Sequence, residues 1–147
     1  MQRFRFRLET LLKVRRRREE QAQLRLTQAI ENLRQAQEDL SLLVDRIEAH
    51  RQEWQNALSQ NKTIADFILY SAYFKQLTLQ MDNQKEVVIA AEKSHLESLF
   101  VFQEAMKQRK VVERLKEKKR QQHYRELLQQ EQNFLDELGT QRYGRDF

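Results

Sequence analysis

Apolar and small side chains recur along the first part of the chain in alternating steps of three and four residues. The seam runs without a slip and consists of Leu12, Arg15, Glu19, Ala22, Leu26, Ala29, Leu33, Ala36, Leu40, Leu43, Ile47, His50, Trp54 and Ala57. This heptad spacing is typical of a helix that packs along one face against another helix. We therefore predict a first helix over about residues 5–59.

The heptad pattern stops in the polar stretch SQNKTIADF, residues 59–67. Thr63 is followed three residues later by Asp66, just before apolar residues. The Thr hydroxyl can accept a hydrogen bond from a free amide of a helix start, and the carboxylate favours the positive end of the helix. The pattern predicts a turn at about 60–63 and a second helix over about 64–140.

The second helix has a seam of its own, with bulkier residues than the Ala layers of the first. Its members are Phe67, Tyr70, Phe74, Leu77, Met81, Gln84, Val88, Ala91, His95, Ser98, Phe102, Ala105, Arg109 and Val112. Because the link between the helices is short, they must run antiparallel, with facing residues whose numbers sum to about 124. The predicted fold is all-α: a long two-helix antiparallel coiled-coil hairpin, in a single domain over residues 1–147. The last residues, 120–147, would form a helical overhang.

Composition supports long helices and excludes most other architectures. The chain has 147 residues, no Pro, no Cys, and only two Gly, at positions 139 and 144, while 33% of its residues are charged. Turns and strand connections depend on Gly and Pro, and disulfides and thiolate metal sites need Cys. Charges interrupt the N-terminal region, and the apolar runs at 87–91 and 99–102 are far shorter than a membrane span. We expect a soluble protein without membrane insertion, and the absence of Cys is compatible with a reducing compartment.

The charges are strongly separated along the chain. Residues 1–18 carry eight basic and one acidic side chain, and residues 107–125 carry nine and two, so each segment sums to +7. Residues 19–106 carry eight basic and fourteen acidic side chains. In an antiparallel hairpin the two basic segments meet at the end away from the turn. Because like charges repel, this cationic end favours an acidic partner over a merely solvated surface.

The charge alone does not identify that partner. Nucleic acid stays open, because Lys and Arg neutralise phosphates without reading bases, although no known DNA-binding motif accompanies the charge. Membrane-surface binding is less favoured, since only Phe4 and Phe6 could insert. A catalytic or metal site is not indicated: His50, His95 and His123 are far apart, and no Gly-rich phosphate loop occurs. We expect no enzyme activity, no cofactor, no metal and no small-molecule substrate.

Both ends of the chain resemble the FliJ family of flagellar export proteins. The similarity rests on FRFRLETLLKVRRRREEQ at residues 4–21 and on RKVVERLKEKKRQQHYRELLQQEQNFLDEL at residues 109–138. The resemblance implies a non-catalytic, cytoplasmic component of the bacterial flagellar type III export apparatus, peripheral to the inner face of the cell membrane. It implies docking of the helix termini in the hexameric export ATPase, contact with the cytoplasmic domain of the export gate protein FlhA, and an association with export chaperones.

Two sets of residues are candidates for these contacts. The ATPase-facing set is basic and consists of Lys13, Arg15, Arg16, Arg17, Arg18, Lys107, Arg109, Lys110, Arg114, Lys116, Lys118, Lys119 and Arg120. The gate-facing set, expected to be exposed near the turn, consists of Ile68, Tyr70, Tyr73 and Leu77. A basic coiled-coil module that binds nucleic acid is the alternative function. Self-association through leftover apolar surface is a third hypothesis, because two helices bury only one seam each.

Overall fold

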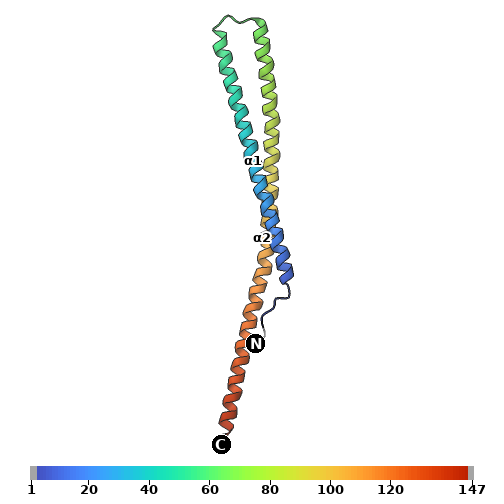
Figure 1. The fold of residues 1–147 in the computed structure, drawn as a ribbon, viewed down its shortest axis with the longest axis vertical. Helices are drawn as coiled ribbons and strands as arrows, with labels where there is room; N and C mark the ends of the chain where they lie inside the picture. Colours follow the sequence, from blue (N-terminus) through green and yellow to red (C-terminus); the bar gives the residue numbers. More distant parts are fainter. Residues whose placement is uncertain (1–2, 146–147) are drawn as a thin grey trace. The chain divides into compact units, whose positions relative to one another are not determined.

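The computed structural model describes residues 3–145, and the regular structure in this range consists of two helices. Helix α1 spans Glu9–Leu58 and helix α2 spans Ile64–Arg145 (Figure 1). The two helices pack against each other and run in opposite directions, so the predicted all-α hairpin is confirmed.

The chain forms two compact units, each built from part of both helices. The turn unit is Gln21–Phe102, and it contains the connection between α1 and α2. The terminal unit combines the described parts of Met1–Glu20 and Gln103–Phe147. That the whole chain acts as a single domain stays a prediction.

The predicted heptad seams form the helix interface in both units. On α1 every seam residue is buried or half-buried, and the Ala layers Ala22, Ala29, Ala36 and Ala57 are all buried. On α2 the buried seam residues are Leu77, Val88 and Val112. Small Ala side chains let the two backbones approach closely, which places the larger α2 residues in the interface. Gln84 extends this match, because its Nε2 donates a hydrogen bond of 3.0 Å to the carbonyl oxygen of Ala36.

Two predicted core residues of α2 are more exposed than the seam requires. Phe67 is 54% exposed and Phe74 is 42% exposed. The Phe67 ring lies 5.3 Å from that of Trp54, so one face packs on α1 while the other faces solvent. Two bulky aromatic layers facing each other leave too little room for every ring to enter the interface.

The first helix begins later than predicted. It starts at Glu9 instead of about residue 5, and the amide of Glu9 donates a 3.2 Å hydrogen bond to the carbonyl oxygen of Phe6. Before it, Phe4, Phe6 and Leu8 are half-buried while the arginines between them are exposed. This alternation is that of an extended segment, and the Phe4 ring lies 5.5 Å from the His123 ring on α2. At the other end, α2 continues to Arg145, beyond the predicted end at about 140.

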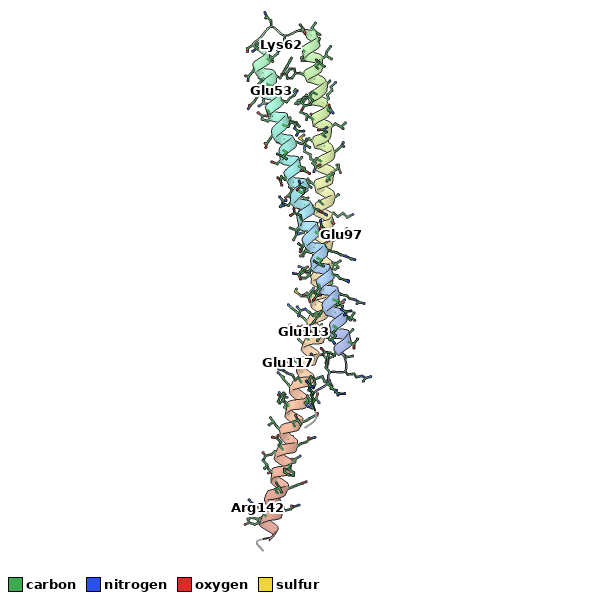
Figure 2. The ribbon with its side chains drawn as sticks, viewed as in Figure 1. Glu53, Lys62, Glu97, Glu113, Glu117 and Arg142 are labelled. Atoms are coloured by element: carbon green, nitrogen blue, oxygen red, sulfur yellow. The ribbon has the colours of Figure 1, made fainter. Side chains whose placement is uncertain are left out.

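The connection is closed by the predicted cap at the start of α2. The Asp66 amide donates to Thr63 Oγ1 at 3.3 Å, and Asp66 Oδ2 accepts from the Thr63 amide at 3.0 Å and from its hydroxyl at 3.1 Å. These bonds satisfy otherwise free donors of the first turn, and they lower the pKa of the Asp66 carboxyl. The predicted helix start is thereby confirmed. Figure 2 shows Lys62 in this connection, next to the end of α1 that carries Glu53.

Neither helix contains a stretch in the described range that is long and apolar enough to cross a membrane.

Candidate partner-binding surfaces

All thirteen basic residues of the predicted ATPase-facing set fall within the terminal unit. The two basic segments contact each other across the helix interface, where Arg15 on α1 bonds to Gln108 on α2 and Arg16 bonds to Glu113. Antiparallel packing therefore brings together residues that lie more than ninety positions apart. The two basic segments therefore lie side by side in the terminal unit, as predicted.

Several of these cations hold the two helices together. Arg109 pairs with Glu19 across the interface, and its Nη1 lies 2.6 Å from Glu113 Oε2 within α2. Glu113 Oε1 also lies 3.4 Å from Arg16 Nη2. The side chains of Arg109 and Glu19 are only 22% and 17% exposed, so this network replaces apolar packing in the seam. A polar layer inside a coiled coil fixes the register of the helices at a cost in stability.

A second pair between the helices lies at the start of α1. Lys116 Nζ is 2.8 Å from Glu9 Oε2. The hydrogen bond from Lys116 is the main cause of a lowered pKa of the Glu9 carboxyl, because it stabilises the charged form. Lys107 and Arg120 pair within α2, with Glu104 and Glu117. Glu113 and Glu117 are labelled on α2 in Figure 2.

The remaining basic residues, here called the free cations, are exposed and have no ion pair within residues 3–145. They are Lys13, Arg17, Arg18, Lys110, Arg114, Lys118 and Lys119. On α2 the spacing of Lys110, Arg114 and Lys118 places them on one face. The structure therefore divides the predicted set into cations that stabilise the hairpin and cations that are available to a partner.

The N-terminal segment adds further positive charge that the sequence-based set omitted. Arg3, Arg5 and Arg7 are exposed on the segment that packs on α2. Together with residues 115–126 of α2, this segment lines an open groove of about 1010 Å³. The signal that could have revealed it is the strict alternation of Arg with apolar residues from Arg3 to Leu8.

The turn unit has a different candidate surface, an aromatic groove of about 280 Å³. It is lined by His50, Arg51, Trp54, Phe67, Tyr70, Ser71 and Phe74. His50 is only 8% exposed; its Nε2 donates to the carbonyl oxygen of Tyr70 at 3.2 Å, and its ring stacks on that of Tyr70 at 4.8 Å. The Trp54 and Tyr70 rings lie 4.6 Å apart. These contacts form the floor of the groove, and Phe67 and Phe74 are exposed at its edge.

The predicted gate-facing residues are divided by the structure. Ile68 is 60% exposed and Tyr73 is 42% exposed, whereas Tyr70 is half-buried in the floor of the groove. Leu77 is 2% exposed, so the expectation that it is a surface residue is wrong. It occupies a seam position, and the seam faces α1. Phe67 and Phe74, which the sequence assigned to the helix interface, are exposed and line the groove.

Among the described residues, no three His, Cys, Asp or Glu side chains cluster closely enough to hold a metal ion. The pairing of His50 with a backbone carbonyl gives that residue a structural role.

We compared the chain with protein-family models, with curated protein sequences and with solved structures. The family model of the flagellar FliJ protein matches residues 4–146 of the 147-residue sequence. The chain belongs to the FliJ family. Membership makes it a component of the type III export apparatus. No curated protein sequence matches it significantly.

The FliJ chain is also similar to a solved structure, that of a YscO homologue from Chlamydia trachomatis. The two share 21% sequence identity with a TM-score of 0.59, and the match covers 94% of each chain. At this level of identity the similarity concerns the fold, which is the same antiparallel arrangement of two long helices.

Proposed function

We propose that this FliJ protein is a non-catalytic adaptor that docks its terminal unit in the hexameric export ATPase and contacts the FlhA export gate through its turn unit. In this role it works in the cytoplasm at the inner face of the membrane and assists export chaperones. The observation that supports the proposal most directly is the set of free cations in the terminal unit. Unpaired, exposed charges of one sign attract a partner of opposite charge and speed its association.

The division between paired and free cations determines which residues test ATPase docking. Reversing Arg16 would also break its pair with Glu113, so a loss of function there would be ambiguous. Arg17 and Arg18 are exposed without an ion pair among the described residues. We expect Arg17→Glu/Arg18→Glu to abolish stimulation of the export ATPase in a hydrolysis assay while leaving the helix content unchanged.

The matched control carries the same charge change in the turn unit. Arg25 and Arg46 are exposed on α1, and neither has an ion pair in the described range. The Arg25→Glu/Arg46→Glu variant should stimulate hydrolysis as the unmodified protein does. If both variants lose stimulation of ATP hydrolysis equally, the effect depends on net charge and not on a docking surface. If Arg17→Glu/Arg18→Glu stimulates hydrolysis fully, the free cations are excluded as the docking surface.

The gate contact is proposed for the aromatic groove and its exposed rim. Ile68 and Tyr73 of α2 are exposed beside the groove and are called its rim here, and the Tyr73 ring also meets the His50 ring edge-on with centroids 4.6 Å apart, so circular dichroism must show that the variant keeps its helix content. We expect Ile68→Ala/Tyr73→Ala to weaken binding to the isolated FlhA cytoplasmic domain at least tenfold by calorimetry. Leu24→Ala/Leu42→Ala, at exposed positions of α1, is the control that should bind normally. Unchanged affinity of the rim variant would place the gate contact elsewhere.

The nucleic-acid alternative is favoured by the same free cations together with Arg3, Arg5 and Arg7. Binding driven by phosphate contacts weakens steeply with salt. Measuring affinity for a duplex or an RNA at physiological salt distinguishes the two functions. Tight binding that Arg17→Glu/Arg18→Glu removes, without any effect on the ATPase, would support the alternative.

A further inference from the structure

The last part of α2 has no helix to pack against within the terminal unit. Every residue from 128 to 144 is exposed, and this stretch follows residues 115–126, where the N-terminal segment packs on α2. Figure 1 shows the end of α2 continuing past the start of α1. We call residues 128–144 the α2 tail.

The α2 tail carries a heptad face of its own. Leu128, Glu131, Leu135, Leu138 and Arg142 follow one another in alternating steps of three and four residues, which places them on one side of the helix. Leu128 is 63% exposed and Leu135 is 61% exposed. The spacing is the one that forms the interface between α1 and α2, but here the face is left without a partner helix.

Two opposite charges stand in this face, at equal distances from its centre. Glu131 lies four residues before Leu135, and Arg142 lies four residues after Leu138. Neither forms an ion pair within the described residues, and Figure 2 shows Arg142 near the end of α2. The other two charged residues of the α2 tail lie on the opposite side of the helix, and they are Asp136 and Glu137. A helix that packs on this face therefore meets one acidic and one basic side chain.

We propose that the α2 tail pairs with the α2 tail of a second copy of this chain, in antiparallel orientation. Leu135 of each copy then faces the partner's Leu138, and Glu131 of each copy faces the partner's Arg142. A two-fold axis makes every such contact occur twice. The interface consists of two inner apolar layers between two outer ion pairs.

The charges select both this occupant and this orientation. Parallel pairing would place Glu131 against Glu131 and Arg142 against Arg142, and such like-charge pairs are unfavourable. Shifting the antiparallel pair by one heptad would place a charge opposite Leu135 or Leu138. The residues that flank the face carry no charge that would repel a second copy, and they are Gln132, Phe134, Gly139 and Gln141.

The face is thus complementary to itself, which is the condition for an interface between two identical chains. It lies outside the free cations and the aromatic groove, so this inference does not depend on the proposed function.

Sedimentation equilibrium of the full chain over a dilution series should show a reversible dimer. Leu135→Gln/Leu138→Gln should weaken it at least tenfold and leave the helix content unchanged, because both side chains are exposed and Gln is a good helix former. Leu24→Gln/Leu42→Gln, at exposed positions of α1, should change the affinity less than twofold. A chain that stays monomeric at its highest soluble concentration, or a dimer that the first variant leaves intact, would overturn the proposal.

Exchange of the charges tests the ion pairs. Glu131→Arg and Arg142→Glu should each weaken self-association at least tenfold, because each variant faces its own copy with like charges. An equimolar mixture of the two variants should dimerise as tightly as the unmodified chain. Glu137→Arg makes the same charge change on the opposite side of the helix and should have less than a twofold effect. A mixture that fails to dimerise would exclude the pairing of Glu131 with Arg142.

Disulfide formation tests the orientation, because the chain contains no Cys and one introduced thiol reports a single position. When Glu131→Cys and Arg142→Cys chains are mixed and oxidised, the mixed disulfide should predominate. In the antiparallel dimer, like positions lie eleven residues apart along the helix axis, about 16 Å, whereas a disulfide needs Cα atoms within about 7 Å. Disulfides that join mainly like positions would show a parallel pair and overturn the proposal.

Discussion

The two units share one fold and one register, but their interfaces are built from different chemistry. In the turn unit, Ala layers on α1 meet large apolar and aromatic residues of α2, and His50 is satisfied by a backbone carbonyl. In the terminal unit, the interface contains buried Leu12 and Val112 but also the ionic network of Glu19, Arg109 and Glu113. The first unit is stabilised mainly by burial of apolar surface. In the second unit, ion pairs replace part of the apolar interface, and basic residues accumulate.

The largest effect is expected from deleting a fully buried side chain in each unit. Leu77 is 2% exposed in the turn unit and Leu12 is 0% exposed in the terminal unit. Leu77→Ala and Leu12→Ala should each cost about 3 kcal/mol, because a cavity replaces a well-packed side chain. Hydrogen exchange should show lost protection chiefly in the unit that carries the change. Equal loss in both units for either variant would mean that they unfold together.

The polar layer of the terminal unit predicts an intermediate effect. Arg109→Met should destabilise this unit by about 1–2 kcal/mol, since Glu19 and Glu113 lose the cation they share. Glu19→Leu/Arg109→Met should restore or exceed the original stability, because an apolar pair replaces a partly buried ion pair. Thermal unfolding followed by circular dichroism measures both. If the double variant unfolds at a lower temperature than Arg109→Met, the ion pair stabilises the terminal unit more than an apolar pair does.

Removing the cap of α2 tests the turn unit at its connection. Thr63→Ala deletes the hydroxyl that accepts from the Asp66 amide and should cost about 1 kcal/mol. Hydrogen exchange should be faster only in the first turn of α2. Thr63→Ser, which keeps the hydroxyl, is the control and should resemble the unmodified chain. Normal protection in the Ala variant would show that packing alone holds this turn.

The smallest effect concerns pH. The folded-state pKa of Glu9 lies below its ordinary value of 4.5 because Lys116 bonds to it, and that of Asp66 lies below 3.8 because of the Thr63 amide. Both groups therefore stabilise the fold above those ordinary values, and the contribution is lost as the pH falls through and below them. Protection factors, corrected for intrinsic exchange, should fall with acid at the starts of α1 and α2. Glu9→Gln should remove the dependence at α1 only.

Much of the fold could be predicted from periodicity, because residues spaced alternately by three and four positions lie on one face of a helix. That face must form the interface with the other helix. The cap was predictable for the same reason, since Thr63 and Asp66 stand at fixed spacing. The start of α1 was not: the helix was predicted from about residue 5, whereas it begins at Glu9, after a segment whose Phe4 ring packs on the His123 ring of α2. Leu77 was misplaced because a seam residue was also considered for the surface.

The candidate sites were predictable by region and not by residue. The sequence located the basic segments, but it could not tell Arg16, which pairs with Glu113, from exposed Arg17. That distinction depends on which acidic side chain reaches across from the other helix. The aromatic groove likewise combines α1 and α2 residues whose rings meet only after the chain folds back.

The sequence by itself determined two amphipathic helices, the place of the turn and the separation of charge, because each follows from local spacing and composition. Only the tertiary structure decided which cations form ion pairs and which aromatic rings stay exposed. The physical reason is that pairing and burial depend on distances between side chains of different helices, and those distances exist only once the helices pack.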